Sequence, residues 1–247
     1  MTALILAAGY GTRMYPLTQN TPKALLPIGG KPILRFLLDK LADPAVEVKE
    51  VVLVSNHRFT PVFEEWFKAQ GGLGLPWRVL DDGTTSDENR LGSVGDIAFA
   101  IGQLKLEGDL LVLGSDNLFT EALTGFMAQA LARTPAATLA VYELPDRSLA
   151  NRYGVLTVTE DHRIVAFTEK PEKPESSLVS TAVYFFPGKM LPRVLQYVDS
   201  AELPDTLGSF IQWLIPREPI FAYRLAGKWF DIGDLASYQQ LQESFTL

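Results

Sequence analysis

Two cations beside a glycine turn are the residues of this chain best suited to phosphate chemistry. Arg13 and Lys23 flank the segment that begins Gly9-Tyr10-Gly11, which directly follows an apolar run. Glycine amides can approach phosphate closely because no Cβ stands in the way, and two cations can neutralise a triphosphate. The dinucleotide fingerprint and the P-loop are both absent, so residue types alone favour a glycine-rich connection with two solvated cations.

Two aspartates far apart in the sequence could hold a divalent cation. Asp116 follows the apolar run Asp109–Gly114, and Asp231 lies in Trp229-Phe230-Asp231-Ile232-Gly233. Magnesium takes oxygen ligands and often uses one or two carboxylates together with substrate phosphates. Taken alone, each aspartate is better explained as a turn or capping residue before the helix that follows it.

Hydrophobic patterning in the first half indicates the elements that would position these residues. Apolar runs predict strands, and apolar residues at helical spacing predict helices between them. The predicted strands are Thr2–Ala8, Glu50–Ser55, Trp77–Leu80, Asp109–Gly114 and Thr138–Tyr142, and the predicted helices are Lys31–Leu41, Thr60–Ala69, Val94–Leu104 and Thr120–Ala132. This alternation predicts an α/β fold of the Rossmann-like, doubly wound type with a mostly parallel mixed sheet.

The second half is richer in predicted strands. These are Tyr153–Val158, Ile164–Thr168, Leu178–Phe186, Ile220–Leu225 and Lys228–Asp231, with helices at Lys189–Val198, Thr206–Leu214 and Leu235–Phe245. We therefore expect a β-rich portion to follow the parallel strands.

The segment LAAGYGTRMYPLTQNTPKALLPI resembles the signature G-x-G-T-R-x-x-P-x-T-x-x-x-P-K-x-L-x-P of the sugar-1-phosphate nucleotidylyltransferases, such as the glucose-1-phosphate thymidylyl-, uridylyl- and cytidylyltransferases. The matching residues are Gly9, Gly11, Thr12, Arg13, Pro16, Thr18, Pro22, Lys23, Leu25 and Pro27. The resemblance implies that the nucleotide is bound by Leu6, Ala7, Ala8, Gly9, Gly11, Thr12, Arg13 and Gly92. It also implies that Arg13 and Lys23 stabilise charge during transfer.

Two further segments are similar to the aspartate motifs of that family. Leu113–Phe119 resembles L-G-D-N-x-F, with Ser115 where the family usually has glycine, and Trp229–Gly233 resembles W-x-D-[IT]-G. The resemblance implies that Mg²⁺ lies between Asp116 and Asp231. We expect Trp229 to pack beneath the second of these ligands.

The residues that would bind the acceptor are also inferred from the resemblance. Phe167–Pro171 resembles F-x-E-K-P, in which the lysine binds the acceptor phosphate and the glutamate bonds sugar hydroxyls. The acceptor-binding residues implied are Asn117, Tyr153, Gly154, Glu169, Lys170 and Thr181. The chain departs from the family at Ala182, where glycine is common, and at 205–211, where the family has an acidic helix.

These resemblances together predict transfer of a nucleoside monophosphate from a nucleoside triphosphate to a sugar 1-phosphate, with Arg13, Lys23, Asp116, Lys170 and Asp231 as the catalytic set. A single domain over 1–247 is expected, with nucleotide binding in roughly 1–135, acceptor binding in roughly 136–247, and no C-terminal β-helix. Two alternatives stay open: a cytidylyltransferase for a non-sugar phosphate such as phosphocholine, and a non-catalytic nucleotide-binding module.

Composition limits the partners. The net charge of −7 argues against nucleic-acid binding, and no apolar run is long enough to span a membrane. The absence of cysteine makes a cytoplasmic location the default expectation. The chain could also assemble as a homo-oligomer.

Overall fold

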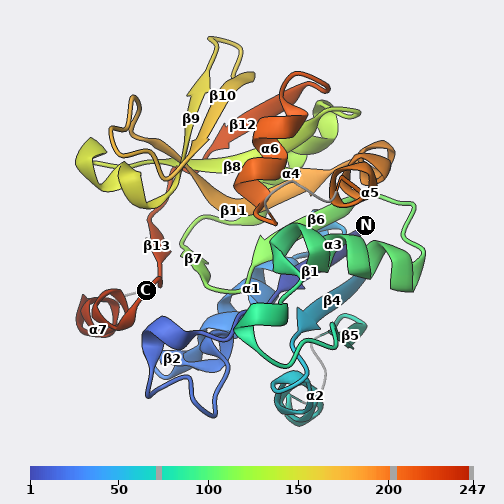
Figure 1. The fold of residues 1–247 in the computed structure, drawn as a ribbon, viewed down its shortest axis with the longest axis vertical. Coiled ribbons are helices and arrows are strands. Elements are labelled where there is room, and N and C mark those ends of the chain that lie inside the picture. The colour runs from blue at the N-terminus through green and yellow to red at the C-terminus, as the bar shows by residue number, and fades with distance from the viewer. Residues whose placement is uncertain (71–73, 201–204, 245–247) are drawn as a thin grey trace. The chain divides into compact units, whose positions relative to one another are not determined.

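The chain forms two compact units, and the computed structural model describes residues 1–70, 74–200 and 205–244 (Figure 1). The first unit comprises Met1–Leu91, Leu113–Thr124 and Gly227–Leu247, and the second comprises Gly92–Val112 and Gly125–Ala226. The first unit thus gathers three separate stretches of sequence. Asp231, near the C-terminus, belongs to the same unit as the glycine turn.

Three parallel strands form the centre of the first unit. They are β1 (Thr2–Leu6), β4 (Glu50–Ser55) and β5 (Trp77–Asp81), with β4 between the other two. Strands β1 and β4 are almost continuously apolar, as expected for strands covered on both faces. Helix α2 (Thr60–Ala69) packs against β5, where the rings of Phe67 and Trp77 stack with centroids 4.8 Å apart.

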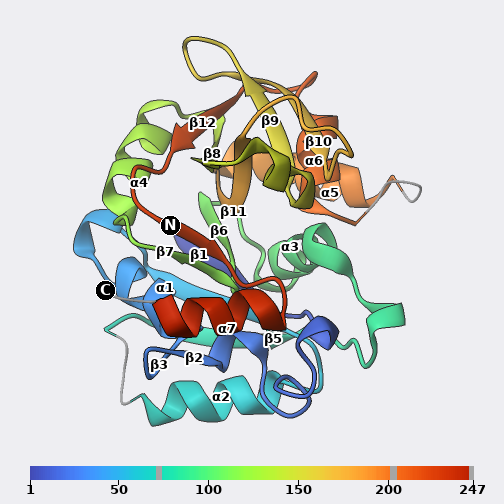
Figure 2. The same cartoon turned by 90° about the vertical axis from the view of Figure 1, so that its left-hand side faces the viewer.

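Two small antiparallel pairs complete this unit with helices α1 (Ile33–Leu41) and α7 (Leu235–Ser244). One pair is β2 (Pro27–Ile28) with β3 (Lys31–Pro32), and the other is β7 (Asn117–Phe119) with β13 (Trp229–Asp231). Helix α7 lies against β2, where the hydroxyl of Tyr238 donates to the carbonyl of Pro27 at 2.7 Å (Figure 2).

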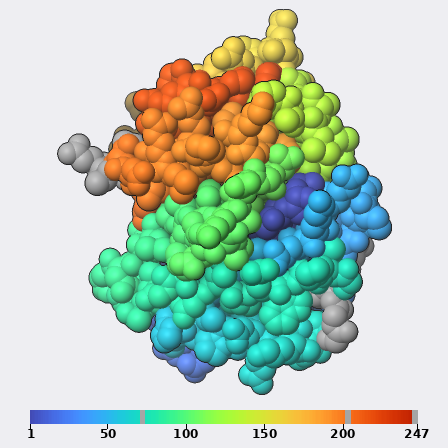
Figure 3. Space-filling model, turned by 90° about the vertical axis from the view of Figure 1, so that its right-hand side faces the viewer, coloured from blue at the N-terminus to red at the C-terminus, as the bar shows by residue number. Residues whose placement is uncertain are grey.

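The second unit is β-rich. Antiparallel pairs join β9 (Gly154–Val158) to β10 (Ile164–Glu169) and β8 (Ala137–Glu143) to β11 (Leu178–Phe186), while β12 (Ile220–Arg224) runs parallel to β8. Its helices are α3 (Gly92–Leu104), α5 (Leu191–Val198) and α6 (Leu207–Leu214). Helix α3, coloured green to blue-green, reaches the surface in Figure 3. The boundary between the units falls within β6 (Leu110–Gly114) and near the start of α4 (Leu123–Ala132).

The predicted α/β class is confirmed, and so is the β-rich second half. The starts of four helices differ from the prediction by two or three residues, and α3 and α5 begin at Gly92 and Leu191 rather than at Val94 and Lys189. Lys31 and Pro32 pair in β3, so α1 begins only at Ile33, and α4 begins at Leu123 rather than Thr120. Strand β7 was not predicted, because its three residues begin inside the turn-like run Ser115-Asp116-Asn117.

Among the described residues, no helix is both long enough and apolar enough to cross a membrane.

Candidate active site

The glycine turn after β1 is held in one conformation by its own chain. Gly11 has a φ of +64°, in the left-handed region that favours glycine, and its carbonyl accepts a 2.7 Å hydrogen bond from the buried hydroxyl of Thr18. A Cβ on Gly11 would lie only 3.2 Å from that threonine side chain. A short 3₁₀ turn, Thr12–Met14, follows and leaves Arg13 exposed. The sequence-predicted glycine turn therefore exists and presents a cation at its end.

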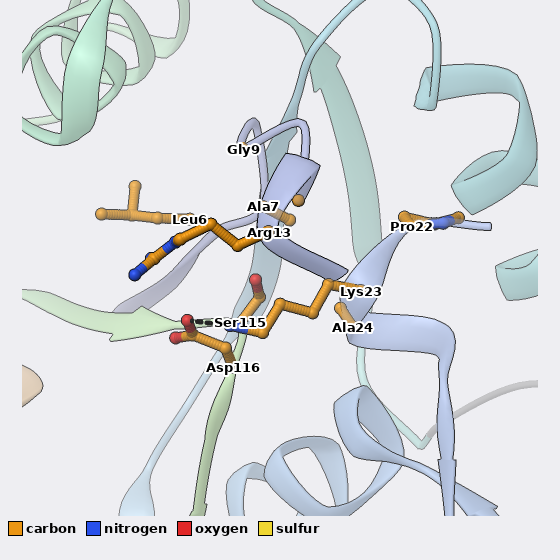
Figure 4. A pocket seen from close by; sticks show the side chains of 10 residues that line it. Leu6, Ala7, Gly9, Arg13, Pro22, Lys23, Ala24, Ser115 and Asp116 are labelled. Carbon is orange, nitrogen blue, oxygen red and sulfur yellow. Dashed lines mark hydrogen bonds and ion pairs between the residues drawn. The ribbon is translucent and has the colours of Figure 1, made fainter. Parts of the chain in front are cut away.

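Lys23 is directed at Asp116 rather than into solvent. A 3₁₀ turn, Lys23–Leu25, begins after Pro22, and the ammonium of Lys23 donates to Asp116 Oδ2 at 2.7 Å (Figure 4). The Lys23 side chain is only 14% exposed. Partial burial alone would raise the pKa of Asp116, but the charge and hydrogen bond of Lys23 outweigh it and lower that pKa below its usual value. The carboxylate is therefore held ionised.

The glycine turn, the lysine turn and the end of β6 line one pocket of about 200 Å³. Its lining residues are Leu6, Ala7, Gly9, Gly11, Arg13, Pro22, Lys23, Ala24, Ser115 and Asp116. Ala8 and Thr12 are not among them; the carbonyl of Ala8 instead accepts a 2.9 Å hydrogen bond from Asn56. Most of the residues expected to bind the nucleotide thus share one cavity.

Asp231 is brought to the same place by the pairing of β7 with β13. In that ladder Asp231 stands opposite Asn117, the residue that follows Asp116. Burial and the neighbouring charge of Asp116 raise the pKa of Asp231 to about 6, against the opposing influence of Lys23 and Arg13. The two aspartates therefore lie close enough to repel each other.

One buried apolar cluster contains residues that adjoin Arg13, Asp116 and Asp231 in the sequence. It contains Met14, Leu26, Ile28, Ile33, Phe36, Leu118, Ile232, Tyr238 and Leu241. Met14 follows Arg13 directly and Ile232 follows Asp231 directly, while Leu118 lies two residues beyond Asp116. Burial of these neighbours fixes the backbone at each charged residue, because a packed core permits little displacement.

The cluster of charges has the chemistry of a divalent metal site. The Asp116 carboxylate is held ionised, and its charge disfavours ionisation of the neighbouring Asp231 carboxyl. A cation bound between them would reduce this repulsion. Carboxylate oxygens are the ligands that Mg²⁺ prefers. Within the described part of the chain, no group of three or more His, Cys, Asp or Glu side chains gathers around one point. The aspartate pair is thus the arrangement that fits such an ion, with further oxygens coming from a ligand.

Five of the six expected acceptor residues belong to the second unit, whereas Asn117 belongs to the first. Glu169, the last residue of β10, stands opposite Gly154, and the amide of Lys170 donates to the carbonyl of Tyr153 at 3.0 Å. Lys170 has a φ of +44°, a strained conformation for a residue with a side chain, and such strain often occurs at functional sites. A Cβ on Gly154 would come within 2.1 Å of the Phe167 ring, so only glycine fits there.

Two other predicted residues of this unit have local roles. Thr181 is buried, and its hydroxyl donates to the carbonyl of Ala140 at 2.8 Å, so its side chain faces the sheet. Its neighbour Ala182, where the family has glycine, adopts a φ of +53° beside a register shift of β11. Gly92 has a φ of +75° at the start of α3, and a Cβ there would collide with Asp205 at 2.3 Å. Asp205, which precedes α6, is thus packed against the turn that opens α3.

A family model described as nucleotidyl transferase matches residues 2–246. The chain belongs to this family. The match covers both units and every residue of the site described above.

Relatives at low identity agree with this assignment. The chain is 27% identical to the bifunctional protein GlmU of Methanocaldococcus jannaschii over 94% of its length, and 27% identical to a UTP–glucose-1-phosphate uridylyltransferase of Synechocystis over 97%. It spans 51% of the first relative and 62% of the second, so it covers less than two thirds of either protein. A solved UDP-glucose pyrophosphorylase with bound UDP-glucose shares the fold, with a TM-score of 0.81 at 19% identity over 98% of this chain and 97% of that one.

Sequence reasoning missed how Asn117 is used. Its side chain is buried: the amide nitrogen donates to the carbonyl of Gly114 at 3.3 Å, and the amide oxygen accepts a 2.9 Å hydrogen bond from Trp229 Nε1. Trp229, which was expected to pack beneath Asp231, is buried and makes this hydrogen bond. The only sign of this hydrogen bond in the sequence is that Asn117 follows Asp116 directly and Trp229 lies two residues before Asp231.

Proposed function

We propose that the chain transfers a nucleoside monophosphate from a nucleoside triphosphate to a sugar 1-phosphate, releasing pyrophosphate. The observation that carries this proposal is the meeting of Asp116, Asp231, Lys23 and Arg13 beside the glycine turn. A binding loop alone would need the cations but not the two carboxylates. Membership of the nucleotidyl transferase family and relatives described as sugar-1-phosphate transferases support the same reaction.

Different residues of the pocket would bind different parts of the nucleotide. The pocket walls at Leu6, Ala7 and Gly9 would receive base and ribose, with Ala8 behind them and Gly92 near the base, and Gly11, Thr12 and Arg13 would bind the phosphates. A Mg²⁺ ion held by Asp116 and Asp231 would neutralise charge on the phosphate oxygens.

On the acceptor side, Lys170 would bind the phosphate of the sugar and Glu169 its hydroxyls. Tyr153 and Gly154 would contribute main-chain contacts. A contact from Thr181 would come from its main chain, because its hydroxyl is used within the sheet. A direct contact of Asn117 with the acceptor stays a prediction.

An oxygen of the acceptor phosphate attacks the α-phosphorus in line, the bond from the α-phosphorus to the bridging oxygen breaks, and pyrophosphate leaves. No covalent intermediate with the protein is required, so the protein contributes positioning and charge stabilisation. Arg13 and Lys23 offset the charge that grows on the departing pyrophosphate, and Lys170 holds the attacking phosphate in place.

The test is a pyrophosphate-release assay over a grid of UTP, dTTP, CTP and GTP against several sugar 1-phosphates and phosphocholine, with Mg²⁺ present. Release with a sugar 1-phosphate supports the proposal, and release with CTP and phosphocholine alone would favour the cytidylyltransferase alternative. Nucleotide binding without release in any combination would favour a non-catalytic module. We also expect the protein to act in the cytoplasm, which fractionation of the producing cell would test.

A further inference from the structure

A single buried amide connects the two segments that carry the aspartates. The amide nitrogen of Asn117 reaches back to the carbonyl of Gly114 and so closes the turn in which Asp116 lies. The amide oxygen of the same side chain accepts from Trp229 Nε1, two residues before Asp231. Asn117 is 3% exposed and Trp229 is 9% exposed, so water does not compete freely for these bonds. Each end of the amide thus serves one aspartate.

The short β7–β13 ladder, which brings the two aspartates together, has little support of its own beyond its backbone pairing. Strands β7 and β13 pair over only three residues, and Asn117 and Trp229 lie 112 residues apart in the chain. Two short strands without further support are marginally stable. The far end of the pair is secured by Thr120, whose amide donates to the carbonyl of Lys228 at 2.9 Å and whose hydroxyl accepts from the Lys228 amide at 2.9 Å. The bond between Asn117 and Trp229 crosses the ladder diagonally, from the residue opposite Asp231 to the residue opposite Phe119, and so supplements the pairing.

We propose that Asn117, through Trp229, is a positioning residue that sets the separation and orientation of the Asp116 and Asp231 carboxylates for a divalent cation. This inference rests on the proposed function, because it gives the aspartate pair a metal to bind. An amide suits the task since it donates and accepts at the same time. A carboxylate at this position could not donate to Gly114, and an aliphatic side chain could make neither bond.

The test removes the donor and keeps the ring. In Trp229→Phe the indole N–H is lost while an aromatic ring remains beside Asp231. Mn²⁺ binding is measured by electron paramagnetic resonance, on the protein alone and with UTP, dTTP, CTP or GTP in turn, without acceptor. Because partners that orient metal ligands commonly contribute this much, we expect Mn²⁺ affinity to fall about 10- to 100-fold. Nucleotide binding in the absence of metal should be unchanged.

A second readout separates positioning from general damage to the fold. In the transfer assay, Trp229→Phe should raise the Mg²⁺ concentration needed for half-maximal rate while kcat at saturating Mg²⁺ stays near that of the wild type. Trp66→Phe is the matched control, since Trp66 belongs to the same unit and its ring meets Phe67 on α2. This control should leave the metal affinity unaltered. A parallel loss of metal-free nucleotide binding and of metal binding would overturn positioning in favour of a merely structural role.

Two other results of the Mn²⁺ binding measurement would contradict different parts of the proposal. Wild-type protein that binds Mn²⁺ while Trp229→Phe binds it equally tightly would refute the positioning role and leave the proposed function intact. Wild-type protein that binds no Mn²⁺, with or without nucleotide, would refute the metal site itself.

Should Trp229→Phe fail to fold, hydrogen exchange at the Trp229 indole of the wild-type protein is followed by nuclear magnetic resonance. Its signal is assigned from Trp→Phe variants at the other three tryptophans. Slow exchange that slows further with Mg²⁺ and nucleotide supports the inference. Exchange at the rate of an exposed indole, or exchange that Mg²⁺ and nucleotide leave unaltered, overturns it.

Discussion

Replacing Asp231 by asparagine should stabilise the protein in the absence of metal. The pKa of Asp231 is raised to about 6 from an ordinary value of 3.8, so the folded state disfavours the ionised form. Above pH 6 both folded and unfolded chains carry the charge, and the folded state bears the full penalty. As pH falls through 6 the folded chain takes up a proton first, and below 3.8 the penalty is gone.

The magnitude follows from the pKa difference. At about 1.36 kcal/mol for each pKa unit, the penalty is at most about 3 kcal/mol at pH 7.5 and about 1 kcal/mol at pH 4.5. Asp231→Asn removes it at both pH values. For a chain of this size, the larger figure corresponds to a rise in Tm of roughly 6 to 12 °C.

The assay is thermal unfolding in the presence of a chelator at pH 7.5 and 4.5, comparing wild type, Asp231→Asn and Asp116→Asn. Asp116→Asn should bring no comparable gain, because Asp116 is paired with Lys23, which would lose its partner. Asp234→Asn is a further control that removes a nearby charge and keeps a residue able to cap α7. A gain for Asp231→Asn that is the same at both pH values, or no gain at all, would refute the assigned electrostatics.

Four other substitutions have definite expected outcomes. Asp116→Ala or Asp231→Ala should abolish nearly all pyrophosphate release, and wild-type rates in either variant at saturating Mg²⁺ would contradict the metal assignment. Lys23→Met should tighten Mn²⁺ binding to the nucleotide-free protein, because the ammonium that now occupies Asp116 is removed, while turnover falls; calorimetric titration showing weaker binding would count against this competition. Gly154→Ala should lower stability by about 1 to 3 kcal/mol in denaturant unfolding, because the added methyl would strike the Phe167 ring, and an unchanged midpoint would show that the ring can move freely.

The sequence predicted the long elements well because burial leaves a readable period. Strand β4 and helix α2 begin and end at the predicted residues, since each carries its own apolar pattern. The three-residue strands β7 and β13 carry no such pattern, and their pairing depends on contacts between distant segments. Local reasoning could therefore place a strand near Asp231 but could not derive its partner.

The residues of the candidate site were likewise predictable only where the local sequence carries a pattern. Residue types allowed phosphate binding at the glycine turn, but a turn or cap was the better explanation of each aspartate until the family resemblance linked the two. Lys23 illustrates what no pattern could reveal, since its partner Asp116 lies 93 residues away. At Ala182 the sequence did give a useful signal. Glycine is common at this position in the family, and the backbone of Ala182 does adopt a positive φ.

The most direct test of the account follows the α-phosphorus itself. Wild-type protein is incubated with Mg²⁺, a sugar 1-phosphate and a nucleoside triphosphate labelled at the α-phosphorus, and the products are separated. We expect the label to enter a sugar nucleotide in equal amount to the pyrophosphate released, and Asp116→Ala to yield neither. Label that remains in the triphosphate with every nucleotide and sugar phosphate tried, or that appears as free nucleoside monophosphate, would contradict this expectation.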